Sequence, residues 1–144
     1  CERGWFGQKT SKGYYLYGEG VEFLTQNPEI EIICNDERKR VGITPKNFSD
    51  QEILDRYIAA MVYEGTKILQ EKIAIRPSDI DVVYTNGYGF PRWRGGPMKY
   101  ADMIGLDKVL ANIKKYYQED KRFWSPPQLL QDLVNNGKNF DSLN

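Results

Sequence analysis

The chain has 144 residues, 40% of them hydrophobic and 13% aromatic, which is enough to form the core of one compact domain and a tethered arm. Its 20 basic and 20 acidic side chains balance, and no basic stripe alternates with stacking aromatics, so we expect no nucleic-acid partner. Histidine is absent, which excludes a Ser-His-Asp triad, a Cys-His pair and a histidine-ligated zinc site. Cys1 and Cys34 cannot complete a thiolate zinc site, so we expect free thiols and no metal.

Residues 1–48 are expected to form a connector arm with one short helix. Glycines and aromatic residues interrupt residues 1–20 too often for a helix, which favours an extended arm that packs by its aromatic side chains. Val21 to Asn35 contains a short apolar run, and Pro28 after Asn27 is placed to open a helix there. Arg38 to Arg40 are interpreted as a solvated face or loop rather than as an anion site.

Residues 49–144 are expected to form one helical domain. Ser49 is a good N-cap and Glu52 completes a capping box, which predicts a long helix from Asp50 to about Ile75. Its apolar residues recur at the spacing of one helical face: Ile53, Leu54, Tyr57, Ile58, Met61, Val62, Ile68, Leu69 and Ile73. Glu64 lies among them, in a place where a carboxylate could be buried, and we interpret it as bonded to a neighbouring backbone group or cation rather than as functional.

Further boundaries follow from proline, glycine and capping residues. Arg76-Pro77 is predicted to end the long helix, and Ser78 to cap a short one bearing Ile80, Val82 and Val83. Pro97 is predicted to open the next helical stretch, with Gly105 as a break. Pro126 and Pro127 precede a final short helix that stops at Asn136-Gly137. No long alternating strand pattern occurs, so the fold is expected to be all-α.

The segment Thr85 to Asp107 contains five glycines and two prolines between helical patterns. So many glycines and prolines predict a loop of specific shape. The glycines are expected where φ is positive or where the backbone lies close to a neighbouring segment, and the prolines where the chain bends. Phe90 and Trp93 supply apolar side chains for burial. A structural corner is the ordinary interpretation of this composition. Arg92 and Arg94 are candidates for binding a phosphate or carboxylate, although loop arginines more often hold a loop in shape.

The sequence contains no nucleotide-binding fingerprint. The peptide Lys9 to Lys12 lacks P-loop spacing, and no glycine fingerprint follows a predicted strand, so we expect the chain not to bind NAD by itself. Asp79 and Asp81 diverge on a helix, and we interpret them as capping residues rather than as an acid/base pair. No long apolar run and no signal-peptide pattern occur, which predicts a soluble intracellular chain without a membrane span.

One block, GYGFP-x-W-x-GGPM-x-YAD-x-x-G over residues 87–105, resembles a motif of a known family. The likeness continues through Glu52 to Tyr84 and includes GQKTSKGYYLY, Gly7 to Tyr17, whereas the tail after Tyr117 matches only loosely. These motifs resemble the C-terminal helical region of L-3-hydroxyacyl-CoA dehydrogenases in multifunctional enzymes of fatty-acid β-oxidation. The resemblance implies an all-α fold of the 6-phosphogluconate dehydrogenase C-terminal type, with the Gly7 peptide as connector between two tandem helical repeats.

The same resemblance implies that this chain is the second helical repeat of a longer enzyme. That enzyme oxidises an L-3-hydroxyacyl-CoA with NAD, using a Rossmann domain and a His-Glu pair upstream. An Asn-Arg pair in the first repeat supplies an active-site asparagine, whereas Asp55-Arg56 stands at the matching place here, so we expect this chain to hold no catalytic residue and no cofactor. It is expected to pack against the first repeat and help shape the acyl-CoA cleft through Arg56, Glu64, Gly87, Gly89, Phe90, Pro91, Trp93, Gly95, Gly96 and Pro97.

Two other functions compete with that expectation. A free-standing helical module would bind a protein partner through its aromatic arm and glycine loop. An autonomous CoA-binding protein is disfavoured because no basic and apolar cluster clearly forms a nucleotide pocket. Bacterial members of the resembled family are cytoplasmic and some eukaryotic ones peroxisomal. Ser142-Leu143-Asn144 is not an SKL-type address, so we expect a bacterial cytoplasm, with the peroxisome as the alternative.

Overall fold

A computed structural model describes residues 1–18 and 25–144, so Gly20 and the start of the helix predicted from Val21 lie outside the described residues. The contacts divide the chain into two compact units, Cys1–Asn47 and Phe48–Asn144. Among the described residues, no helix combines the length and apolar character needed to cross a membrane.

The first unit is a small hairpin followed by a helix. Its elements are the 3-10 helix η1 (Gln8–Thr10), strands β1 (Tyr15–Leu16) and β2 (Thr25–Gln26), and helix α1 (Pro28–Val41). The strands pair antiparallel, with Tyr15 opposite Gln26. Asn27 is buried and fixes the start of α1, because its side chain accepts from the Glu29 N–H at 3.1 Å and donates to the Gly13 carbonyl at 2.9 Å. The predicted opening of a helix at Pro28 is therefore confirmed.

The arm was predicted to pack by its aromatic side chains, and this prediction is wrong for most of them. Phe6 and Tyr14 are exposed, and none of the described residues of the first unit buries a large apolar side chain. Polar contacts hold the unit instead: Lys12 forms a 2.5 Å ion pair with Glu29 and lies 4.2 Å from the centre of the Trp5 ring. The hairpin is thus fixed by a cation shared between an aromatic face and a carboxylate.

Over its described residues 48–144, the second unit contains helices and no strand, which confirms the prediction of an all-α fold. It contains α2 (Asp50–Gln70), α3 (Pro77–Gly87), η2 (Arg92–Arg94), α4 (Pro97–Ile104), α5 (Leu106–Tyr117), α6 (Gln128–Asn135) and η3 (Phe140–Leu143). The capping box of Ser49 and Glu52, the helix start at Pro97 and the break at Gly105 are confirmed. The turn η3 had no counterpart among the sequence predictions.

The junction between α2 and α3 corrects two predictions. Helix α2 ends at Gln70 rather than near Ile75, because Lys72 takes a positive φ of 60° and the N–H groups of Ile73 and Ala74 bond back to the Ile68 carbonyl. Helix α3 then starts at Pro77, so Arg76 occupies the N-cap position and Ser78 does not. The Asp79 carboxylate accepts from the Arg76 N–H at 3.1 Å and pairs with its guanidinium, which closes the helix start.

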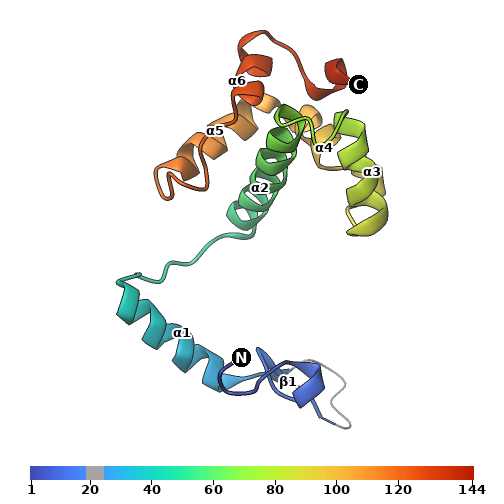
Figure 1. Cartoon of the computed structure of the whole chain (residues 1–144). Helices are drawn as coiled ribbons and strands as arrows, with labels where there is room; N and C mark the ends of the chain where they lie inside the picture. The colour runs from blue at the N-terminus through green and yellow to red at the C-terminus, as the bar shows by residue number, and fades with distance from the viewer. Residues whose placement is uncertain (19–24) are drawn as a thin grey trace. The chain divides into compact units, whose positions relative to one another are not determined.

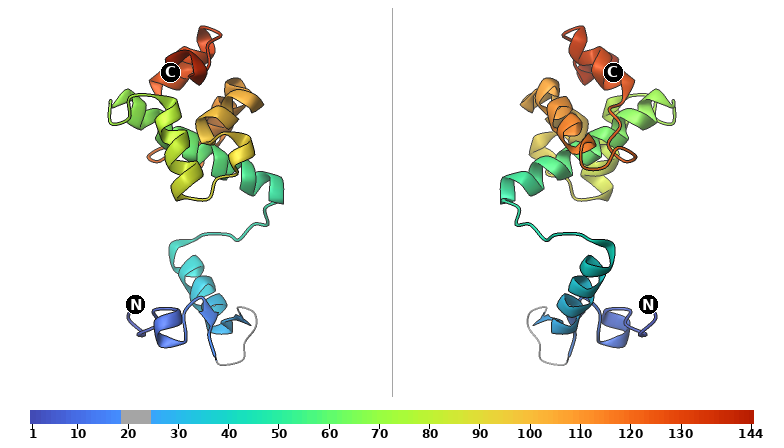
Figure 2. Two further views of the ribbon diagram at one scale, coloured as in Figure 1. Left: turned by 90° about the vertical axis from the view of Figure 1, so that its right-hand side faces the viewer. Right: turned by 90° about the vertical axis from the view of Figure 1, so that its left-hand side faces the viewer.

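The core lies around α2, which runs through the middle of the second unit with α5 on one side and α3 and α4 on the other (Figures 1 and 2). Five apolar side chains from α2, α4, α5 and α6 are completely buried: Val62, Met98, Ala101, Ile113 and Leu130. Gly65 makes this packing possible, since a Cβ there would lie 2.6 Å from the Met98 sulfur. The second half of α2 thus carries most of the buried residues of this helix, whereas much of its first half lies at the surface.

Candidate functional site

The glycine loop, residues 87–97, packs by one aromatic residue and exposes the other. Phe90 is buried, its ring centre 6.4 Å from that of Tyr100, as predicted. Trp93 was predicted to be buried and is 76% exposed, because η2 turns it outward while the Arg94 guanidinium lies 4.5 Å from the ring centres of both Trp93 and Tyr100. The loop thus presents a large indole on its surface, held against a cation.

The other residues of the loop form the connection between α3 and α4. Gly87 is the last residue of α3, Pro91 precedes η2, and Pro97 is the buried first residue of α4. Gly89 and Gly95 take positive φ angles of 69° and 80°. The Arg92 guanidinium donates to the Asn86 side chain at 3.0 Å, which ties η2 back to α3. Both loop arginines therefore contact neighbouring protein groups.

Asp81 determines how α4 leaves the loop. Its buried carboxylate accepts from the backbone N–H groups of Met98 at 2.7 Å and Lys99 at 3.0 Å, so α3 caps α4 from 17 residues away. Burial raises the pKa of the Asp81 carboxyl, and the two N–H donors oppose that shift. Gly96 is in contact with the same group, since a Cβ on it would lie 2.5 Å from Asp81 Cγ. Asp79 and Asp81 both serve as caps, as interpreted from their spacing.

A groove of about 400 Å³ opens beside the first half of α2, lined by Phe48, Ile53, Arg56, Tyr57, Ala60 and Trp124. Ile53 and Tyr57 were counted with the buried face of the helix, yet they are 56% and 60% exposed. Helical periodicity gave the correct face, but no other element of the described residues covers its first two turns. The lining is apolar apart from one guanidinium, which suits an apolar side chain rather than a charged ligand.

Arg56 stands at the edge of this groove. Its guanidinium donates to Glu119 at 2.9 Å and lies 4.0 Å from the centre of the Tyr116 ring, so it joins α2 to α5. Asp55, its neighbour, accepts from the Gln51 side chain at 2.7 Å within the same helix. Glu64 is exposed rather than buried: its side chain is 59% exposed, and it pairs at 3.9 Å with Lys67, a neighbouring cation of the same helix.

Tyrosines extend the exposed surface from α2 to α3. Burial raises the pKa of the Tyr84 hydroxyl, and Tyr57, Tyr88 and Glu64 raise it further. The ring centres of Tyr84 and Tyr88 are 5.4 Å apart, and Tyr88 is 75% exposed. We define the tyrosine face as Ile53, Tyr57, Tyr84, Tyr88 and the groove residues. It borders the glycine loop, of which Tyr88 is the second residue.

Two carboxylates of the second unit serve as helix caps. The buried Asp81 and the half-buried Asp102 accept backbone N–H groups, so their oxygens are engaged in helix capping. Among residues 1–18 and 25–144, no group of three or more cysteine or acidic side chains is placed to hold a metal ion. The groove had no counterpart among the sequence predictions, although the spacing of Ile53, Tyr57 and Ala60 places these three side chains along one side of α2.

Comparison with known proteins identifies the family. Residues 53–141 match the model of the 3-hydroxyacyl-CoA dehydrogenase C-terminal domain. The chain is 45% identical over 140 residues to the peroxisomal bifunctional enzyme of Danio rerio, covering 95% of this chain and 20% of that protein. It is 40% identical over 140 residues to the human protein of the same name, covering 95% of this chain and 19% of that one.

A bacterial relative extends the comparison. The fatty acid oxidation complex subunit alpha of a Psychrobacter species is 33% identical over 137 residues, covering 93% of this chain and 18% of that protein. The chain therefore spans about a fifth of the length of these curated relatives. The family match covers the glycine loop, helices α3 to α6 and all of α2 except its first three residues. This chain belongs to the family of 3-hydroxyacyl-CoA dehydrogenase C-terminal domains.

Proposed function

We propose that the chain is the second helical repeat of a multifunctional fatty-acid β-oxidation enzyme, which oxidises L-3-hydroxyacyl-CoA to 3-ketoacyl-CoA with NAD. The proposed role of this part is non-catalytic: it packs against the first helical repeat and helps to shape the acyl-CoA cleft. NAD would bind the Rossmann domain of the same polypeptide. The observation that carries the proposal is the tyrosine face, an uncovered apolar surface on a family domain that spans a fifth of its relatives.

The contacts of Asp55 and Arg56 support a packing role. In the resembled enzymes an asparagine next to the arginine reaches the active site, but Asp55 here bonds within α2 and Arg56 bonds to Glu119, just after α5. The exposed Trp93 and Tyr88 of the glycine loop add aromatic area to the surface, and aromatic side chains dominate the energetics of protein interfaces. The loop residues Gly87 to Pro97 are proposed to border that interface, and the buried side chain of Phe90 holds the loop against the core.

A chimera tests this proposal. In the Danio rerio enzyme, the segment matching this chain is replaced by the chain, and dehydrogenase activity is measured with NAD and a 3-hydroxyacyl-CoA. The chimera should be active, and Tyr57→Ala together with Trp93→Ala should lower its melting temperature or raise the KM for acyl-CoA about tenfold, as expected when two aromatic interface residues are lost. Both side chains are more than half exposed here, so the isolated chain should lose little stability.

Met103→Ala is the matched control, because Met103 is 61% exposed on α4 and lines neither the groove nor the glycine loop. It should leave both melting and KM of the chimera unchanged. If the Tyr57 and Trp93 variants also leave them unchanged, the tyrosine face is not an interface of the enzyme. Tight binding of acyl-CoA by the isolated 144-residue chain would instead favour an autonomous CoA-binding protein.

For the compartment, we propose the peroxisome rather than the bacterial cytoplasm expected from the sequence. The support is that identity to the peroxisomal relatives, 45% and 40%, exceeds the 33% to the bacterial one. An antibody raised against the chain tests this together with the size of the parent. A band several-fold heavier than 16.7 kDa that sediments with peroxisomes supports both proposals, and a cytosolic band at 16.7 kDa contradicts both.

A further inference from the structure

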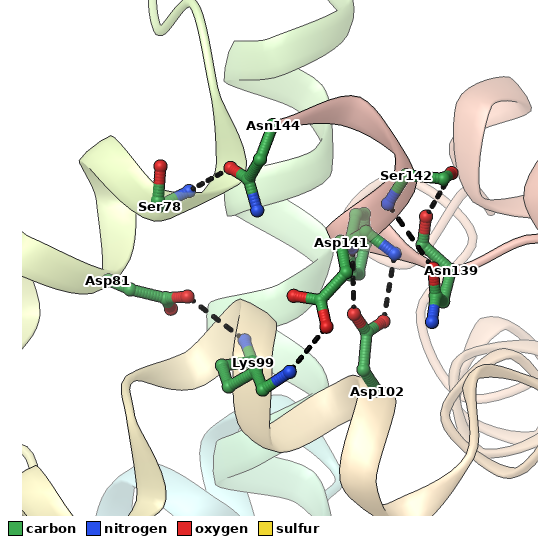
Figure 3. Close-up of polar contacts among 9 residues, drawn as sticks. Ser78, Asp81, Lys99, Asp102, Asn139, Asp141, Ser142 and Asn144 are labelled. Carbon is green, nitrogen blue, oxygen red and sulfur yellow. Dashed lines mark hydrogen bonds and ion pairs between the residues drawn. The ribbon is translucent and has the colours of Figure 1, made fainter.

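Three elements of the second unit cap one another in a closed cycle (Figure 3). Asp81 of α3 accepts from Met98 and Lys99 at the start of α4. Asp102 of α4 accepts from the N–H groups of Phe140 and Asp141 at the start of η3, both at 2.9 Å. The side chain of Asn144, which follows η3, accepts from the Ser78 N–H at the start of α3 at 2.9 Å. We call these three links the capping cycle.

Each link satisfies N–H groups that a helix start leaves without an intrahelical partner. The partners are 17, 38 and 66 residues apart, so each link fixes one element against another rather than closing a local turn. The Phe140 side chain, 1% exposed, anchors η3 in the core, and the Lys99 ammonium pairs with Asp141 as a second bond between α4 and η3. The turn η3 is thereby joined to both neighbours of the glycine loop.

We propose that the capping cycle makes the turn η3 a conformational control of the glycine loop. The loop runs from the end of α3 to the start of α4, and Gly96 contacts the Asp81 carboxylate directly. When η3 detaches, Asp102 and Ser78 lose their partners, and of the three links in the cycle only that of Asp81 still joins α3 to α4. The Met98 and Lys99 caps become free to open, and the loop that they hold loosens with them. This coupling is independent of what binds the loop.

Amide hydrogen exchange of the 144-residue chain, measured by NMR, tests the coupling. Asp102→Asn keeps the size of the side chain, but its NH₂ group cannot accept a backbone N–H. Asparagine keeps one acceptor oxygen, so exchange should rise about tenfold at whichever of Phe140 and Asp141 loses its acceptor. Exchange at Met98 and Lys99, which Asp102 does not touch, should rise about threefold or more because the links are coupled. Val62 and Ile113 in the core should exchange as before.

Asp120→Ala is the local control, because one carboxylate oxygen of Asp120 accepts from two backbone N–H groups, those of Arg122 at 2.9 Å and Phe123 at 3.2 Å, within one local turn. Its effect should stay at those two amides. Asn144→Ala opens the cycle at another link, and should raise exchange at Ser78 and also at Met98 and Lys99. This second variant keeps the test valid if Asp102→Asn does not fold.

Two results would overturn the proposal. In the first, exchange rises only at Phe140 and Asp141 in Asp102→Asn and only at Ser78 in Asn144→Ala, which makes the links independent caps. In the second, Val62 and Ile113 accelerate by the same factor as Met98 and Lys99, which means that the variants act through global unfolding and not through the glycine loop.

Discussion

Replacing Gly96 with alanine is expected to lower the free energy of unfolding by about 3 kcal/mol or more, since backbone strain and the loss of a helix cap add together. Gly96 has a φ of 118°, outside the range that side chains favour, and an added Cβ would lie 2.5 Å from Asp81 Cγ. Asp81 would have to move, and the N–H groups of Met98 and Lys99 would lose their acceptor. Urea unfolding followed by circular dichroism measures the change.

Gly89→Ala separates the two causes in that experiment. Gly89 lies in the same loop with a positive φ of 69°, but no atom lies within 4 Å of the place its Cβ would take. Its replacement should cost about 1 kcal/mol, the cost of the backbone conformation alone. Equal losses for the two variants would show that contact between Gly96 and Asp81 does not matter, and the proposed shape of the loop would lose its physical basis.

Replacing Phe140 with alanine is the second large effect, expected to cost about 3–5 kcal/mol, the usual range for a fully buried phenylalanine. Phe140 is 1% exposed, and it is the residue through which η3 enters the core. The loss combines removed apolar burial with the cavity left behind. Thermal and urea unfolding of the 144-residue chain check it, with circular dichroism reporting the helices of the second unit.

Leu143→Ala is the appropriate comparison because Leu143 lies in the same turn and is 37% exposed. It should cost less than about 1 kcal/mol, as a partly exposed side chain removes little buried surface. If Phe140→Ala proves too unstable to measure, Phe140→Leu should still cost more than Leu143→Ala. A Phe140 variant as stable as the Leu143 variant would mean that η3 is not docked in solution.

Local signals in the sequence were sufficient where both partners of a contact are a few residues apart. The capping box joins Ser49 to Glu52, Pro97 has no N–H to lose at a helix start, and Gly105 takes a φ of 96° between two helices. The family motif was equally local, because it is a fixed order of residues in one loop. These features identified the all-α class, most helix starts and the family.

Other features depended on what the rest of the chain covers. Val62 and Tyr57 belong to the same periodic pattern of α2, yet Val62 is fully buried and Tyr57 is 60% exposed. Periodicity specifies a face of a helix, but whether another element packs on it depends on the path of residues far away in sequence. The exposure of Trp93 likewise depends on its surroundings, since Arg94 and the turn η2 direct this side chain outward although a large aromatic ring suits a core.

The sequence by itself thus determined the helical class, the capped start of α2, the start of α4 at Pro97, the break before α5 and the family, because each depends on hydrogen bonds or backbone preferences within a few residues. Only the tertiary structure decided that α2 ends at Gln70, that its first half carries an open groove, and that Asp81, Asp102 and Asn144 cap helices 17, 38 and 66 residues away. Such long-range pairs exist only after folding has brought the elements together, so no local pattern encodes them.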